Sequence, residues 1–383
     1  MTELGFAMLG HGFMGRAHSL ALRALSALEE RPAAVPRLVS ICGRDTKAVE
    51  RSRAQYGWDE AVSDWREQVG DDRVAVFDNT GPNHLHEEPC LAAVRAGRHV
   101  FCEKPLATSA GAALRLWLEA ERAGVVHMCG FNLRFVPAVR LARELLESGQ
   151  LGTPTHFRAR FLASSALRAD QRRTWRFQRS AAGSGAVADL GSHLVDLARW
   201  LAGEVEAVSA ATRTYVRERD GAPVDVDDAF AAVVELEGAA IGTLEASRAA
   251  GRRAGECAFQ VDATRGSLSF DAGRLNELEL ATRRKETRRI EVTDPRHPFM
   301  ELWWPAPGHA IGWGDSFTHE LRHLVTAVTG ETSVRPYGAD FEDGYRCAEV
   351  CDAILRAAET GARQAVEYRR ARAAAPAVAG SGA

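Results

Sequence analysis

The stretch that decides the fold is Gly5-Phe6-Ala7-Met8-Leu9 followed by Gly10-His11-Gly12-Phe13-Met14-Gly15. The first five residues predict a buried strand, and a helix is expected after the glycines, to about Leu28. In such a unit the glycines allow a tight turn, a close approach of the backbone to a pyrophosphate, and close packing of helix on strand. The helix N-terminus offers free N–H groups to the anion. A glycine-rich turn without a ligand is the weaker interpretation, because both the strand and the helix are present.

The second strand is expected at residues 37–42, and it ends in Gly43-Arg44-Asp45. An acidic residue at this strand tip usually binds the ribose hydroxyls of NAD. Gly43 takes that place here. Arg44 could meet the 2′-phosphate of NADP or lie against the adenine of either cofactor, and Asp45 could reach the ribose after a small shift. The sequence therefore leaves NAD and NADP open.

Lys104 is one of only three lysines, with Lys47 and Lys285, in a chain whose other cationic side chains are arginine. A strand at 73–77, a turn at 78–83, a helix at 86–96 that stops at Gly97, and a strand at 99–102 precede it. This strand–helix–strand unit predicts a parallel sheet, with Lys104 just beyond the carboxyl end of a strand, where such sheets bind ligands. An ammonium can donate to a reacting oxygen. A surface lysine at a strand end is the plainer alternative.

The second half of the chain has a different pattern, with consecutive strands and short turns that predict a mostly antiparallel sheet. Helices could cover one face, and the other face could pair with a second subunit. Two amphipathic helices, at about 315–329 and 340–358, are expected to pack back on the first half. The strands are expected at 156–162, 205–217, 229–237, 241–247, 257–263, 267–270 and 275–281. We divide the chain into a dinucleotide-binding domain (1–130), a substrate-binding and oligomerisation domain (131–370) and a disordered tail (371–383).

A second chemical cluster lies at Asp189-Leu190-Gly191-Ser192-His193, at the start of a helical pattern. Asp189 and His193 are four residues apart and are expected on one helix face. A carboxylate there can fix the tautomer of the imidazole, as a general base near neutral pH requires. The alternative is a capping aspartate and a core histidine. Asp196 could also contact the ring, although a role in the helix or the domain junction suits it better.

Whole-chain properties indicate a cytoplasmic enzyme. The chain has 383 residues, long enough for two domains, and a formal net charge of −3, which does not suit a nucleic-acid or membrane surface. No apolar run is long enough to span a bilayer, and no signal peptide is recognisable. The seven cysteines are scattered and are expected to be reduced core residues. Cys347 and Cys351 lack a second pair, so no metal site is predicted.

These motifs together resemble the Gfo/Idh/MocA oxidoreductases. The resemblance extends to about residue 365 and rests on the glycine turn, Asn83 with His86, residues 96–105, residues 130–135 and residues 189–193. It implies a Rossmann domain, doubly wound around a parallel sheet, that carries NAD or NADP. It also implies a C-terminal α/β domain with a large, mostly antiparallel open sheet that commonly forms homodimers or homotetramers.

The resemblance also implies site residues. Lys104, Asp189 and His193 match the catalytic group: His193 takes the hydroxyl proton, Lys104 supports the oxygen as hydride leaves for the nicotinamide, and Asp189 orients His193. Glu103 is expected to position Lys104 or the nicotinamide. Residues expected to bind the cofactor are Gly10, Gly12, Phe13, Met14, Gly15, Arg44, Asp45, Thr80, Asn83, His86, Glu103 and Lys104.

The substrate is expected to be a small, sugar-like molecule. Asn132, Arg134, Trp175 and His309 are the candidates to contact it, although structural roles fit Arg134 and His309 about as well. Residues 307–313 are similar to the subgroup that contains levoglucosan dehydrogenase and the sugar dehydrogenases of aminoglycoside pathways. The main hypothesis is an NAD(P)-dependent dehydrogenase of a sugar, cyclitol or aminoglycoside. An NAD-dependent glycosidase and a non-catalytic NAD(P)-sensing regulator of the same fold are the alternatives.

Overall fold

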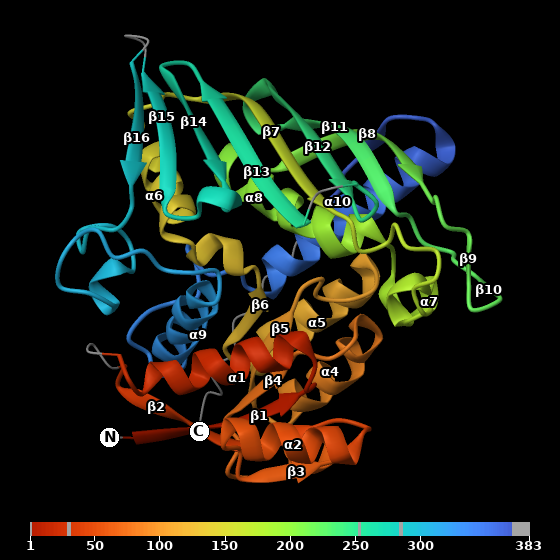
Figure 1. Cartoon of the computed structure of the whole chain (residues 1–383), viewed down its shortest axis with the longest axis vertical. Helices are drawn as coiled ribbons and strands as arrows, with labels where there is room; N and C mark the ends of the chain where they lie inside the picture. The colour runs from red at the N-terminus through yellow and green to blue at the C-terminus, as the bar shows by residue number, and fades with distance from the viewer. Residues whose placement is uncertain (1, 29–31, 252–253, 283–285, 370–383) are drawn as a thin grey trace, which may run out of the picture.

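The computed structural model describes residues 2–28, 32–251, 254–282 and 286–369. These residues form two large sheets and one two-stranded hairpin, with helices between the large sheets and on the faces of the first (Figure 1). The expected tail lies outside the described residues. No helix in the described ranges is both long enough and apolar enough to cross a membrane.

The first sheet has six strands in the order β3-β2-β1-β4-β5-β6, and all its pairs are parallel. This order, with helices on both faces, is the doubly wound arrangement of the Rossmann fold. Its strands are β1 (Thr2–Leu9), β2 (Ala34–Cys42), β3 (Glu60–Val62), β4 (Val76–Asn79), β5 (His99–Glu103) and β6 (His127–Gly130). Its helices are α1 (Phe13–Leu25), α2 (Thr46–Tyr56), α3 (Trp65–Gly70), α4 (Glu87–Arg95) and α5 (Ala110–Ala123).

The register brings the strand ends that carry the sequence motifs to one edge. Leu9 pairs with Asn79 and with Cys42, and Asn79 pairs with Cys102. The glycine turn, the 43–45 turn and Lys104 therefore start from the same edge of the sheet, as the sequence predicted.

The second sheet has nine strands in the order β16-β15-β14-β13-β7-β12-β11-β8-β17. Every pair is antiparallel except β7 with β12, so the sheet is mixed but mostly antiparallel. The strands are β7 (Pro154–Ala163), β8 (Val205–Arg213), β11 (Ala229–Leu236), β12 (Ala240–Ser247), β13 (Ala254–Ala263), β14 (Gly266–Asp271), β15 (Glu277–Thr282), β16 (Thr287–Glu291) and β17 (Gln364–Ala365). The first seven follow the expected segments, whereas β16 and β17 were not anticipated. A short hairpin, β9 (Glu218–Arg219) with β10 (Ala222–Pro223), lies apart.

The helices of the second half lie on the side of this sheet that faces the first domain (Figure 1). They are α6 (Pro137–Glu147), α7 (Arg179–Ala182), α8 (Ser192–Ala202), α9 (Asp315–Val328) and α10 (Phe341–Thr360). As expected, the last two pack back on the first domain, α9 against α1 and α10 against α5. No helix of the described residues covers the other face of the sheet (Figure 1).

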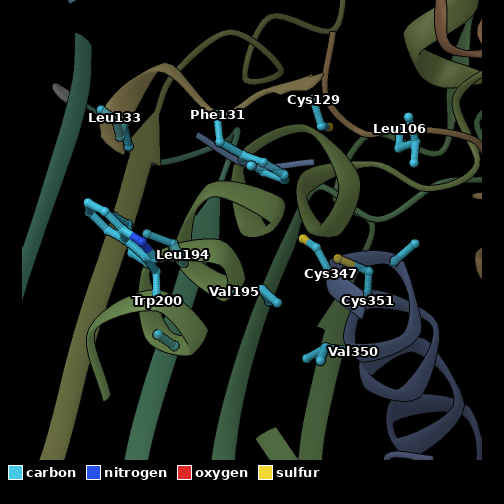
Figure 2. Packing of buried hydrophobic residues seen from close by; sticks show 14 of the residues in the cluster. Leu106, Cys129, Phe131, Leu133, Leu194, Val195, Trp200, Cys347, Val350 and Cys351 are labelled. Carbon is cyan, nitrogen blue, oxygen red and sulfur yellow. The ribbon is translucent and has the colours of Figure 1, made fainter. Parts of the chain in front are cut away.

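One apolar core continues from the first domain into the second. Figure 2 shows Phe131, which follows β6, above both Leu194 of α8 and Cys347 of α10. These side chains belong to one buried cluster that spans both sheets. All seven cysteines are buried and free, which confirms their expected role in the core.

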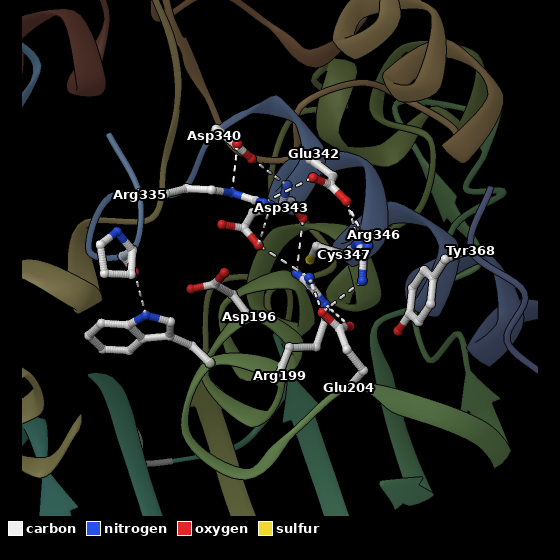
Figure 3. Close-up of polar contacts among 12 residues, drawn as sticks. Asp196, Arg199, Glu204, Arg335, Asp340, Glu342, Asp343, Arg346, Cys347 and Tyr368 are labelled. Atoms are coloured by element: carbon white, nitrogen blue, oxygen red, sulfur yellow. Dashed lines mark hydrogen bonds and ion pairs between the residues drawn. The ribbon is translucent and has the colours of Figure 1, made fainter. Parts of the chain in front are cut away.

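A largely buried ionic network joins α8 to α10 (Figure 3). Asp343 accepts from Arg199 at 3.2 Å and from Arg134 at 3.2 Å. Arg199 also holds Glu204 at 2.7 Å, and Glu204 in turn receives Arg346 at 3.2 Å. Because α8 carries His193, this network fixes the helix that presents a predicted site residue.

Candidate active site

A cavity of about 850 Å³ runs from the carboxyl edge of the first sheet to the second domain. The first domain lines it with residues 9–14, 42–45, 63–66, 80–83, Leu85 and 103–105. The second half contributes Asn132, Phe161, Trp175, Arg176, Ala182, Ser184, Asp189, Leu190, His193, Arg248, Trp313 and Phe317. Its size and its position at the strand ends suit a dinucleotide with a small second ligand.

The glycine turn forms a cradle at one end of the cavity. Gly10 has φ of +111°, and a Cβ there would lie 2.6 Å from the Thr80 hydroxyl. A Cβ on Gly15 would lie 2.3 Å from the carbonyl oxygen of Gly10, so this glycine serves packing and does not line the cavity. A Cβ on Gly12 would meet nothing within 4 Å, because the residue faces open space.

The N-terminus of α1 opens on the same space. Gly12 is its N-cap, no side chain caps the helix, and the first turn has no acidic residue. Its unpaired amides are the groups that bind phosphate at a helix N-terminus. The residues present therefore fit the pyrophosphate of NAD or NADP.

The carboxylates at the adenosine end are already engaged. Asp45 lines the cavity but caps α2 by accepting from the amide of Ala48 at 3.0 Å. Asp64 accepts from the amide of Arg66 at 3.0 Å and caps α3. Arg44 is exposed and pairs with no other described residue. The groups at this end therefore fit the adenosine part of either NAD or NADP.

Lys104 enters the middle of the cavity from the end of β5. Its Nζ donates to the carbonyl oxygen of Asp189 at 2.8 Å and lies 3.6 Å from the carboxylate Oδ1 of the same residue. Glu103 accepts from the backbone amide of Lys104 at 3.0 Å. The two domains thus meet at this ammonium, and a surface lysine is not what the structure shows.

His193 lies in the same part of the cavity, but its expected hydrogen bond to Asp189 is absent. The segment Val187–Gly191 is a π-helical turn, so the regular spacing assumed from the sequence does not hold. Among the described residues, Asp189 engages Lys104, and Nδ1 of His193 is buried without a hydrogen-bond partner. The prediction that Asp189 orients the imidazole is therefore wrong for this structure.

The environment keeps His193 neutral. Burial, and then the positive charge of Lys104, lower the pKa of His193 well below 6.5. Its ring lies among aromatic side chains, with its centroid 5.8 Å from that of Phe161 and 6.2 Å from that of Phe131. An imidazole that is neutral at physiological pH can accept a proton.

The other residues expected near the cofactor divide into two groups. Phe13, Met14, Thr80, Asn83 and Glu103 line the cavity with Gly10, Gly12, Arg44, Asp45 and Lys104. His86 does not, because it is buried behind the wall, where its ring nitrogens lie 2.8 Å from the Pro105 carbonyl and 3.0 Å from the Gly81 carbonyl. It connects the two loops that form the wall.

Two of the four expected substrate residues line the cavity. Asn132 donates to the hydroxyl of Ser316 at 2.9 Å, and Trp175 is stacked with the guanidinium of Arg176. Arg134 does not reach the cavity, because its 2% exposed side chain is bonded to Asp196 at 2.5 and 2.9 Å. Asp196 is therefore engaged by a guanidinium of its own domain and not by the ring of His193.

His309 lies on an exposed loop outside the cavity lining. Its Nδ1 is 3.1 Å from the carbonyl oxygen of Ala306, and its ring lies near Trp304. The structure therefore brings neither Arg134 nor His309 to the site.

Sequence reasoning missed several residues of the site. His18 is buried below the cavity between Asp78 and Glu103. Trp313 stacks on Phe13 of the glycine turn, with ring centroids 5.6 Å apart. Phe161, Arg176 and Arg248 line the substrate end. Arg176 and Trp313 lie in loop segments whose aromatic and polar residues suit a sugar, whereas no local pattern identifies His18, Phe161 or Arg248, because their contacts reach residues distant in sequence.

Comparisons with known proteins agree with this geometry. Residues 4–131 match the family description "Oxidoreductase family, NAD-binding Rossmann fold", and residues 139–269 match "GFO/IDH/MocA C-terminal domain". The chain is 35% identical to levoglucosan dehydrogenase of Pseudarthrobacter phenanthrenivorans over 380 residues, covering 94% of this chain and 97% of that protein.

Solved structures give the same picture. A levoglucosan dehydrogenase structure in complex with NADH and L-sorbose has a TM-score of 0.92 at 35% identity, covering 96% of this chain and 100% of the other. GenD2 from gentamicin A biosynthesis, in complex with NAD, has a TM-score of 0.76 at 27% identity and covers 96% and 97% of the two chains.

Proposed function

The chain belongs to the Gfo/Idh/MocA family of NAD(P)-dependent sugar and polyol oxidoreductases, and on that premise we propose that it oxidises a secondary hydroxyl of an uncharged sugar. One observation carries the proposal. Lys104 and His193 line one cavity with the glycine turn at residues 10–14, and the two side chains are close enough for the charge of Lys104 to act on His193. Two groups able to act on one substrate oxygen therefore share a cavity with the residues that would hold the cofactor's pyrophosphate.

The roles follow from charge. NAD(P), when bound, supplies the acceptor for the hydride that leaves the substrate carbon. His193 is neutral and accepts the hydroxyl proton. Lys104 donates a hydrogen bond to the same oxygen and stabilises the negative charge that develops there. Asp189 holds Lys104 through its carbonyl oxygen, so it acts on the ammonium rather than on the imidazole.

The substrate end favours an uncharged sugar over an aminoglycoside. Three cationic side chains line this end of the cavity, those of Lys104, Arg176 and Arg248. Two carboxylates, those of Asp189 and Glu103, line it with them. Asp189 is already engaged by Lys104, and Glu103 by the Lys104 amide. Repulsion from Arg176, which forms no ion pair with a described residue, disfavours a polycationic ligand. Trp175 and Phe161 offer apolar surfaces suited to a sugar ring.

The test is a panel of anhydrosugars, hexoses, cyclitols and aminoglycosides, each with NAD and with NADP, followed by nicotinamide absorbance. We expect turnover with an uncharged sugar and its loss in Lys104→Met. Lys47→Met, a change of an exposed lysine on α2, is the matched control and should retain wild-type rates. Turnover only with aminoglycosides would overturn the substrate class, and an unaffected Lys104→Met enzyme would overturn the mechanism.

We also propose that the bare face of the second sheet pairs with another copy of the chain. This face exposes Val233 of β11 and Ile241 of β12, at 43% and 47%, at a hollow that extends over β7, β8 and β11 to β15 and that Val233 lines. Adjacent exposed apolar side chains on a sheet commonly mark an interface. Light scattering should show a dimer or tetramer that Ile241→Glu weakens, and a wild-type monomer would refute the proposal.

A further inference from the structure

A fully buried histidine connects the cofactor helix to the backbone of Lys104. His18 lies on α1, with its Nδ1 at 3.1 and 3.0 Å from the two carboxylate oxygens of Asp78. Its Nε2 is 3.1 Å from Oε1 of Glu103. The other oxygen of Glu103 accepts from the Lys104 amide at 3.0 Å. One chain of contacts therefore runs from β4 through α1 to the residue after β5.

The geometry favours a charged ring. A neutral imidazole has only one N–H, whereas both ring nitrogens of His18 face carboxylates, and only the imidazolium can donate to both of them. Burial alone would lower the pKa of His18, but the charges of Asp78 and Glu103 and their hydrogen bonds outweigh it and raise the pKa to about 10. The imidazolium persists at neutral pH.

The surroundings leave Glu103 little freedom. The ring of His18 is packed between Phe101, with centroids 5.2 Å apart, and Phe317, at 5.6 Å. The nearby Glu320 of α9 is fully buried, and burial together with the charge of Glu103 raises its pKa well above 4.5; among the described residues, neither of its carboxyl oxygens has a hydrogen-bond partner, His18 included. Both oxygens of Glu103 thus have fixed partners.

We propose that His18 is a positioning residue which, by bridging Asp78 and Glu103, fixes the backbone of Lys104 relative to the phosphate-binding N-terminus of α1. Three buried ionic groups stabilise a fold no better than apolar side chains of similar volume would. They do hold one geometry, and a displacement of about 1 Å at a reacting group can cost about 10²-fold in rate. Only the predicted effect of His18 on turnover rests on the proposed function; the positioning of the Lys104 backbone does not.

The matched variants are His18→Asn and His18→Gln. The Asn amide can replace the Nδ1 donor toward Asp78, whereas the longer Gln amide can replace the Nε2 donor toward Glu103. Both remove the positive charge. If His18 acts through Glu103, His18→Asn lowers kcat by about 10- to 100-fold with KM for the sugar little changed, and His18→Gln loses less.

The chain allows a readout that needs no turnover. It has only three lysines, so reductive ¹³C-methylation gives three resolvable lysine signals, and Lys104→Arg identifies that of Lys104. We expect the Lys104 signal to move in His18→Asn, to move less in His18→Gln, and the Lys47 and Lys285 signals to stay. Wild-type turnover of a sugar tests the proposed function separately.

Two results would overturn the inference. One is a Lys104 signal and a kcat that are unchanged in His18→Asn. The other is a loss of activity in both variants that follows only their loss of thermal stability. If His18→Asn does not fold, ¹⁵N-histidine spectra of the wild-type protein still decide: His18 protonated on both nitrogens at pH 8 supports the bridge, and a neutral ring refutes it.

Discussion

Replacing Arg134 by methionine should cost stability and leave sugar affinity unchanged. The guanidinium holds Asp196 through two hydrogen bonds, at 2.5 and 2.9 Å, and both side chains are 2% exposed. It also donates to Asp343 at 3.2 Å. Arg134→Met keeps much of the apolar volume but leaves Asp196 buried without its cation.

The expected loss is large because an unpaired buried charge remains. Removing one partner of a buried ion pair typically costs about 3–5 kcal/mol. At about 2–4 °C per kcal/mol for domains of this size, the Tm should fall by roughly 6–20 °C. Arg134→Met/Asp196→Asn should recover part of that loss, since the stranded carboxylate is neutralised.

The assay measures the Tm by thermal unfolding, and kcat and KM by steady-state kinetics. Arg95→Met is the control, because Arg95 is 62% exposed and pairs with Glu119 at 2.9 Å, so its loss should cost only about 0–1 kcal/mol. An Arg134→Met protein with wild-type Tm and a strongly raised KM would refute the structural role and restore the substrate role expected from the sequence.

The other predictions concern the histidines and the glycine turn. Since the pKa of His18 is raised from 6.5 to about 10, its charged ring stabilises the folded state fully below pH 6.5, and this stabilisation is lost as pH rises through 10. The difference in unfolding free energy between wild type and His18→Gln should therefore shrink over that range. A difference that stays constant would contradict this. Because burial and the charge of Lys104 lower the pKa of His193, kcat/KM should fall on the acid side only well below pH 6.5. Lys104→Met should raise the pKa of His193 as measured from its NMR signal. An unchanged pKa in that variant would argue against the proximity of the two side chains. Gly12→Ala should keep its Tm but weaken NADH binding at least about tenfold, or 1.4 kcal/mol. Gly10→Ala should lower the Tm, because its Cβ would meet Thr80 at 2.6 Å. Equal NADH affinity in Gly12→Ala and wild type would show that the phosphates do not bind in the open space beside Gly12.

The features that were predicted correctly from the sequence depend on local patterns. The glycine turn, the position of Lys104 at a strand end and the strand segments of the second sheet each depend on a few neighbouring residues, and the structure contains all of them. The mostly antiparallel sheet followed from short turns. The division at residue 130 and the oligomer remain predictions.

The features that were not predicted from the sequence depend on contacts between residues far apart in the chain. His18 is 60 residues from Asp78 and 85 from Glu103. Asp78 was assigned to a turn, but it is a buried residue of β4. The parallel pairing of β7 with β12 likewise has no local signal.

The Asp189–His193 error has a different origin. A π-helical turn changes the angle between residues four apart, and nothing in the apolar spacing reveals it. For Arg134 the sequence left a substrate role and a structural role equally open, because a guanidinium beside a site motif suits a ligand as well as a buried carboxylate; the structure shows the second.

The central claim is that Lys104 and His193 act on the same substrate oxygen. The most direct measurement is kcat/KM for wild type, Lys104→Met, His193→Asn and the double variant, with one sugar and one cofactor. We predict that each single variant loses about 10²–10⁴-fold, and that the double variant loses far less than the product, because groups that act as a unit are not additive. Losses that multiply, or a single variant with wild-type activity, would contradict the account.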